Sequence, residues 1–193
     1  NVGWGIIKVP HPIQYTRNEG TRLMPGSIEQ IEVLTHKMRN RLTRYPTTTA
    51  VIRKSLEEQE LPEEELEVII STLTTEGFLN DANYAAEYVY SMRRKGKSPE
   101  IIRQELALKG VGEDTIMEAL QESESDNHVE VERLAEELLT KELAKTPLEW
   151  GSTDKALRRT YGKLQRLGYD HEAAEPAITK ALDSLLDKMP PKL

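Results

Sequence analysis

Apolar residues recur at helical spacing along most of this chain, and the pattern is clearest between Leu79 and Leu120. The first helix predicted there has an apolar stripe at positions i, i+1, i+4, i+5 and i+8, made by Tyr84, Ala85, Tyr88, Val89 and Met92. Ser98 followed by Pro99 is typical of a helix start. The serine hydroxyl caps free backbone N–H groups, and proline is tolerated at the first helical position because the N–H that it lacks would have no partner there. Lys109-Gly110 ends this second helix, since glycine readily takes the left-handed conformation. A third helix follows, so the segment predicts a small three-helix bundle.

The same pattern occurs earlier in the chain at a constant offset. Leu56, Leu61, Leu66 and Ile70 have the spacing of Leu106, Val111, Ile116 and Leu120 (106 − 56 = 50), and Ile52-Arg53 matches Ile102-Arg103. Agreement of four apolar positions and an Ile-Arg pair without a gap indicates an internal repeat. The first copy has Gln59-Glu60 where the second has Lys109-Gly110, so we expect its middle helix to end differently.

A third, looser copy follows. Asn127 with Glu130 has the spacing of a helix cap, the segment 146–151 (TPLEWG) resembles an insertion, and Ser152 begins another helix. Leu164, Gly168 and Tyr169 then reproduce Leu106, Gly110 and Val111 at a longer offset (164 − 106 = 58). Pro176 is expected either to open the last helix or to kink it.

These patterns predict an all-α chain of three tandem three-helix-bundle repeats. Repeats of this kind contact mainly their neighbours, so we expect an elongated, curved array. The predicted divisions are an N-terminal arm (1–26), three repeats (27–78, 79–124 and 125–189) and a frayed tail (190–193). The arm is rich in glycine and proline and not helical; Ile6, Ile7 and Val9 fit one short strand, and a flexible arm fits equally well.

Composition narrows the class of protein. The chain has no cysteine, which excludes disulfides and thiolate metal sites. No apolar run approaches the roughly 20 residues that cross a bilayer, and the first residues do not resemble a signal peptide. We therefore expect a soluble, cytoplasmic protein with no membrane partner. We also expect the chain to act as a monomer.

Charge is segregated along the chain, although the net charge is −7. Basic residues gather in the second and third copies; an acidic run at 57–81 precedes them, and a second one at 113–132 separates them. A field of alternating sign can bind a polyanion locally while the whole molecule stays acidic. The alternative is that each charge block is only a solvated helix face.

No catalytic or cofactor motif is present: there is no phosphate-binding P-loop, no G-x-G-x-x-G, no H-E-x-x-H and no G-x-S-x-G. The chain is therefore predicted not to be an enzyme and to need no cofactor or metal. What remains is a binding surface for a partner or for DNA, with nine candidate residues: Arg93, Arg94, Lys97, Arg103, Lys109, Arg158, Arg159, Lys163 and Arg166. Arginine suits phosphates and carboxylates equally, so these residues alone do not separate DNA from protein. Tyr88, Tyr90 and Tyr161 either stack on bases or belong to the core.

One string of residues resembles a family signature. It consists of Gly77-Phe78-Leu79-Asn80-Asp81, Tyr84-Ala85, Arg93, Gly96-Lys97-Ser98, Ile102-Arg103, Glu105-Leu106 and Lys109-Gly110-Val111. It is similar to that of the RecX family, bacterial regulators of the RecA recombinase, and the likeness is dense over about 73–120.

The resemblance implies binding along the groove of the RecA–single-stranded DNA filament. It also implies inhibition of filament growth, ATPase, strand exchange and coprotease activity, by capping or by groove insertion. The competing hypothesis is a helical-repeat DNA-binding protein or an adaptor that acts without a recombinase.

Overall fold

The computed structural model of the chain describes residues 28–123, 127–145 and 152–188. Within these ranges the regular structure is entirely helical, which confirms the all-α class. The arm, the TPLEWG segment and the tail lie outside the described residues. The helices are α1 (Ile28–Arg44), α2 (Thr49–Glu57), α3 (Glu63–Thr75), α4 (Asp81–Arg94), α5 (Pro99–Leu108), α6 (Glu113–Glu122), α7 (Asn127–Lys145), α8 (Ser152–Arg166) and α9 (His171–Asp187).

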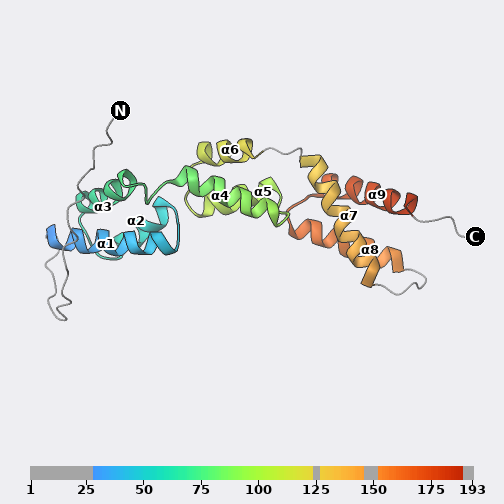
Figure 1. Cartoon of the computed structure of the whole chain (residues 1–193), viewed down its shortest axis with the longest axis horizontal. Coiled ribbons are helices and arrows are strands. Elements are labelled where there is room, and N and C mark those ends of the chain that lie inside the picture. Colours follow the sequence, from blue (N-terminus) through green and yellow to red (C-terminus); the bar gives the residue numbers. More distant parts are fainter. Residues whose placement is uncertain (1–27, 124–126, 146–151, 189–193) are drawn as a thin grey trace, which may run out of the picture.

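The helices form three bundles that follow one another along the molecule (Figure 1). Helices α1–α3 lie at one end, α4–α6 in the middle and α7–α9 at the other end, so the elongated array is confirmed. Each bundle has its own apolar core, and the three cores are separate clusters. The molecule is therefore a row of small domains rather than one globule. The boundaries at 78/79 and 124/125 stay predictions, and Leu79 itself packs in the first core.

The repeated apolar positions are the centres of these cores. Leu56, Leu106 and Leu164 are equivalent by the two offsets, and each is fully buried. Replacing such a leucine with alanine costs about 2–5 kcal/mol, because a cavity remains where the side chain was. The regular spacing of these leucines in the sequence therefore reflects three equivalent cores in the structure.

A polar contact between the middle and last helices repeats as well. Arg53 donates to Glu63 at 2.9 Å in the first bundle, and Arg103 donates to Glu113 at 3.1 Å in the second. In the third bundle Tyr161 and His171 take the same two positions, with Oη and Nδ1 3.2 Å apart. All three pairs are ten residues apart in sequence. The third copy therefore keeps the geometry of the repeat while changing its chemistry.

The ends of the three middle helices are also alike. Glu60, Gly110 and Gly168 all have positive φ, at 55°, 77° and 91°. The expectation that the first copy ends differently is therefore wrong, because Glu60 takes the left-handed turn that glycine takes in the other two copies. Gly110 has a further reason to be glycine: a β-carbon there would lie 2.3 Å from Ala50 Cβ of the preceding bundle. Glu60 is exposed, so its side chain meets no such obstacle.

Two hydrogen bonds join neighbouring bundles at equivalent places. The Thr48 hydroxyl, at the start of α2, donates to the carbonyl of Lys109 at 2.5 Å. The Ser98 N–H, at the start of α5, donates to the carbonyl of Leu167 at 2.7 Å. Each bond connects the start of one middle helix to the end of the next. The relative orientation of the bundles is thus set by buried polar contacts as well as by apolar packing.

Helix α9 runs through Pro176, which lies in its second turn. The helix begins five residues earlier, where the Asp170 carboxylate accepts the N–H of Ala173 at 2.9 Å. Pro176 therefore does not open the helix. Its missing donor costs least near a helix start, where several N–H groups lack partners within the helix.

Candidate partner-binding surface

Arg93 is buried in the joint between the second and third bundles. It is 9% exposed, and its guanidinium lies 3.5 Å from the Glu130 carboxylate of α7. It follows Val89 by four residues and so points from the buried face of α4. Arg93 therefore lies in the joint between the two bundles, and its candidate role in binding stays a prediction.

Arg94, the next residue, faces outward. Its guanidinium lies 5.6 Å from the centroid of the Tyr90 ring, within the range of a cation–π contact. Tyr90 is 63% exposed, so this aromatic surface is open to solvent. Tyr88 and Tyr161 are half-buried instead, and both hydroxyls are hydrogen-bonded. Of the three tyrosines proposed for stacking, Tyr90 alone offers an exposed ring.

Lys97 and Lys109 belong to a network around Glu105. The Glu105 carboxylate binds the Lys97 ammonium and accepts the Tyr88 hydroxyl at 2.8 Å, while the Lys109 ammonium lies 5.4 Å from the centroid of the Tyr88 ring. Burial and the hydrogen bond to Glu105 raise the pKa of Tyr88 to about 12. Partial burial opposes ionisation of Glu105, but the bonds from Lys97 and Tyr88 hold its pKa below the usual value. These lysines mainly tie α4 to α5.

Arg103 is engaged on both sides. It pairs with Glu100 at 3.2 Å on its own helix and with Glu113 at 3.1 Å on α6. These hydrogen bonds, first to Glu100 and then to Glu113, raise the pKa of Arg103. A partner would have to compete with two carboxylates for this cation.

The basic residues of α8 have a counter-ion on another helix, which the sequence of α8 itself does not reveal. Glu142 of α7 is only 6% exposed and accepts from Lys163 at 2.5 Å, with Lys145 at 3.4 Å and Arg159 at 3.7 Å. The hydrogen bond from Lys163 is the main reason that the pKa of Glu142 is lowered. Arg159 and Lys163 therefore help to join α7 to α8.

The outer side of α8 keeps two exposed arginines. Arg158 is 81% exposed and pairs with Asp154 at 3.0 Å, an exposed pair that is worth little in water. Arg166 is exposed, and no carboxylate of a described residue lies within ion-pair distance. Among the candidate residues on α8, these two side chains are the most accessible to a partner.

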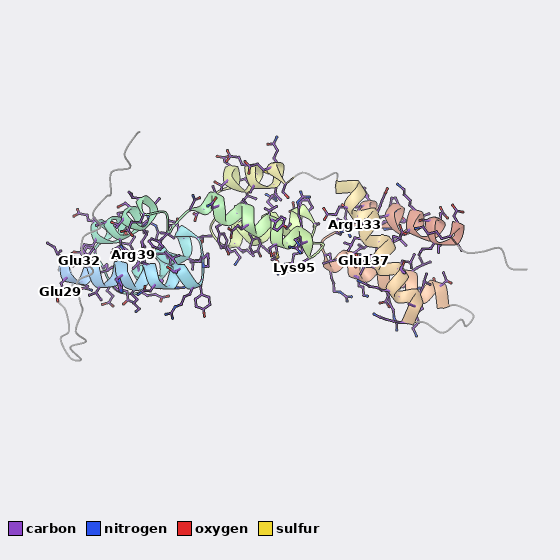
Figure 2. All side chains as sticks on the ribbon, viewed as in Figure 1. Glu29, Glu32, Arg39, Lys95, Arg133 and Glu137 are labelled. Atoms are coloured by element: carbon purple, nitrogen blue, oxygen red, sulfur yellow. The ribbon has the colours of Figure 1, made fainter. Side chains whose placement is uncertain are left out.

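One cation that the charge pattern did not predict is Arg133 of α7. It directly follows the acidic run that ends at Glu132, so the local sequence gives no basic signal there. It lines the same cavity as Arg93 and Arg94, at the joint between the second and third bundles. Figure 2 shows Arg133 on α7 near the end of the second bundle, where Lys95 is labelled.

The described part of the chain offers no metal site. Within it, no group of three or more His, Cys, Asp or Glu side chains could hold a metal ion. Among the described helices, none combines the length and apolar character needed to cross a bilayer. Fold and surface together define a helical-repeat protein with a partly neutralised basic surface.

Comparison with known proteins places this architecture in a family. Residues 80–120 match the family model described as the second three-helix domain of RecX. The chain is 33% identical over 129 residues to the regulatory protein RecX of Trichlorobacter lovleyi, covering 66% of this chain and 82% of that protein. It is 30% identical over 143 residues to regulatory protein RecX of Streptomyces coelicolor, covering 74% and 73%.

A solved structure agrees with the sequence matches. A crystal structure of regulatory protein RecX superposes with a TM-score of 0.58 at 28% identity, over 78% of this chain and 71% of that one. The chain belongs to the RecX family of regulatory proteins.

Proposed function

We propose that this chain is a negative regulator of the RecA recombinase. It binds the RecA–single-stranded DNA filament along its groove and inhibits filament growth, ATPase, strand exchange and coprotease activity. It does so as a monomer in the cytoplasm, without a cofactor and without catalysis of its own. Membership of a family of regulatory proteins supports this function.

The observation that carries the proposal is the distribution of accessible cations along an elongated array. Arg94 and Arg133 flank the joint between the second and third bundles, and Arg158 and Arg166 lie on α8. A rod with cations spaced along it suits a long polyanionic groove, because each contact neutralises charge at a different point along the partner.

The first bundle contributes differently. On its middle helix Arg53 donates to Glu63 at 2.9 Å and also to Glu67, and the hydrogen bond to Glu67 is the main reason that the pKa of Arg53 is raised. On α1, Arg39 is bound by Glu76 at 2.6 Å. These two arginines are therefore less available to a DNA backbone than Arg158 and Arg166 are.

The test is a matched pair of charge reversals. The double variant Arg158→Glu/Arg166→Glu changes two exposed α8 residues, and Lys37→Glu/Lys54→Glu makes the same charge change on exposed positions of the first bundle. Binding of each labelled variant to preformed RecA–single-stranded DNA filaments is measured by anisotropy. We expect the α8 variant to bind at least about tenfold more weakly and the control to change little. Equal affinities in both double variants would remove α8 from the interface.

A further inference from the structure

A cavity of about 400 Å³ lies at the joint between the second and third bundles. We call it the junction cavity; its lining is Tyr90, Arg93, Arg94, Ser123, Glu130 and Arg133. Three guanidinium groups and one carboxylate give it a formal charge of about +2 (3 − 1 = 2). Arg133 also pairs with Glu137 of its own helix at 3.5 Å, an exposed pair that is worth little in water, so its guanidinium stays accessible.

The corresponding joint between the first and second bundles provides an internal comparison. Its cavity is smaller, about 240 Å³, and its lining includes the α4 N-cap Asn80 together with Asn83 and Glu87 of α4. No basic side chain of a described residue lines it. Since the same kind of joint forms without arginines there, packing the bundles together does not explain three arginines here.

Arg93 has hydrogen-bonding capacity that the protein does not use. Its hydrogen bond to Glu130 is long at 3.5 Å, and its buried Nε has no acceptor among the described residues. A guanidinium carries five donors, so a buried one normally has several acceptors. An oxyanion with several acceptor oxygens would supply what Arg93 lacks, and Arg94 and Arg133 line the same cavity to share its charge.

Aromatic surface lies next to this charge. Tyr90 lines the cavity and is 63% exposed. A base stacked on an exposed aromatic ring beside a cationic groove is the usual way in which proteins hold single strands without reading their sequence. The Ser123 hydroxyl, at the C-cap of α6, offers a neutral donor beside the arginines.

We infer that the junction cavity binds a nucleotide phosphate, with Arg93, Arg94 and Arg133 around the phosphate and the attached base on Tyr90. The inference deepens the proposed function, since it gives the strand in the filament a defined contact on this chain. The phosphate belongs to a single-stranded DNA backbone or to a free nucleotide. These two sources share the chemistry and differ in the number of phosphates neutralised.

The test uses the protein without any recombinase. Binding of a 5′-labelled dT12 oligonucleotide is measured by anisotropy over a range of salt, with ATP and inorganic phosphate as competitors. Arg94→Gln and Arg133→Gln are compared with Arg44→Gln, which changes the position equivalent to Arg94 (94 − 50 = 44) in the first bundle. Tyr90→Leu tests stacking, and thermal unfolding of each variant checks that the fold is intact.

We expect Arg94→Gln and Arg133→Gln each to weaken dT12 binding about fivefold or more, and each to reduce the salt slope by about 0.7. Tyr90→Leu is expected to weaken binding by a similar factor, because stacking is lost. Arg44→Gln should bind as the unaltered chain does. Displacement of dT12 by micromolar ATP would assign the cavity to a free nucleotide, whereas displacement only by other strands would assign it to DNA.

An unchanged affinity and salt slope in the Arg94→Gln/Arg133→Gln double variant would overturn the inference. That outcome would not touch the proposed function, because RecA is absent from the assay. Conversely, loss of dT12 binding in the double variant would support the cavity even if the unaltered chain had no effect on RecA.

Discussion

Gly168 packs directly against Ser98: a β-carbon at position 168 would lie 2.3 Å from the Ser98 hydroxyl oxygen. The same hypothetical atom would lie 2.1 Å from Ile101 Cγ1, also in the second bundle. Gly168 has φ +91°, so its backbone is strained for any other residue as well. The close packing of the second and third bundles at this joint therefore requires a residue without a side chain at position 168.

The first prediction separates the steric clash at position 168 from the backbone strain there, as two reasons why glycine is required. Gly168→Ala should lower the free energy of unfolding by about 2–4 kcal/mol, because a clash adds to backbone strain. Gly77→Ala has a similar φ of +78° but nothing within 4 Å of the new β-carbon, so it should lose only about 1 kcal/mol. Urea unfolding followed by circular dichroism measures both. Equal losses of unfolding free energy in the two variants would show that the close packing of Gly168 against Ser98 does not contribute to the cost.

The second prediction concerns Glu60. Its φ of 55° is costly for a residue with a β-carbon, so Glu60→Gly should stabilise the chain by about 0.5–1 kcal/mol. Glu58→Gly is the control, because Glu58 has φ −63° and has nothing to gain from glycine. It should destabilise by about 0.5–1 kcal/mol through added freedom of the unfolded chain. The same urea experiment gives both values, and a loss of stability in Glu60→Gly would contradict the account.

The third prediction concerns pH. The pKa of Glu142 is lowered in the folded protein, chiefly by the hydrogen bond from Lys163. The stabilisation is therefore fully present above the unfolded-state pKa, whose ordinary value is 4.5, and is lost as the pH falls through the lower folded-state pKa. Glu142→Gln should be less stable at pH 7 and should lose less of its remaining stability on acidification.

Thermal unfolding between pH 7 and pH 3 tests this prediction. Glu172→Gln is the matched control, because Glu172 is exposed on α9 and lies outside the Glu142 network. Parallel pH profiles for the unaltered chain and Glu142→Gln would mean that Glu142 does not anchor the basic side of α8.

Much of this fold could be predicted from short-range patterns in the sequence. Ser98 with Pro99 marks the start of α5, and the Ser98 hydroxyl accepts the Ile101 N–H at 3.4 Å as a cap should. The constant offset between Leu56 and Leu106 located two equivalent cores, because helical periodicity and burial both act at short range. The residues that resemble the family signature lie in the same segment, about 73–120.

The binding surface was harder to predict, because counter-ions come from distant segments. Glu142 is 21 residues from Lys163, and Glu130 is 37 residues from Arg93. A charge count within one helix does not include either contact. The spacing of Arg93 after Val89 did contain the signal for burial, whereas Arg133 beside an acidic run contained none.

The measurement that tests the central claim most directly is the single-strand-dependent ATPase of RecA during titration with this protein. The proposed function predicts inhibition at substoichiometric amounts, together with binding to preformed filaments. The Arg158→Glu/Arg166→Glu variant should need a higher concentration for the same effect. An unchanged ATPase at several-fold excess over the cognate RecA would contradict the proposal and leave a helical-repeat protein that acts on DNA or on another partner.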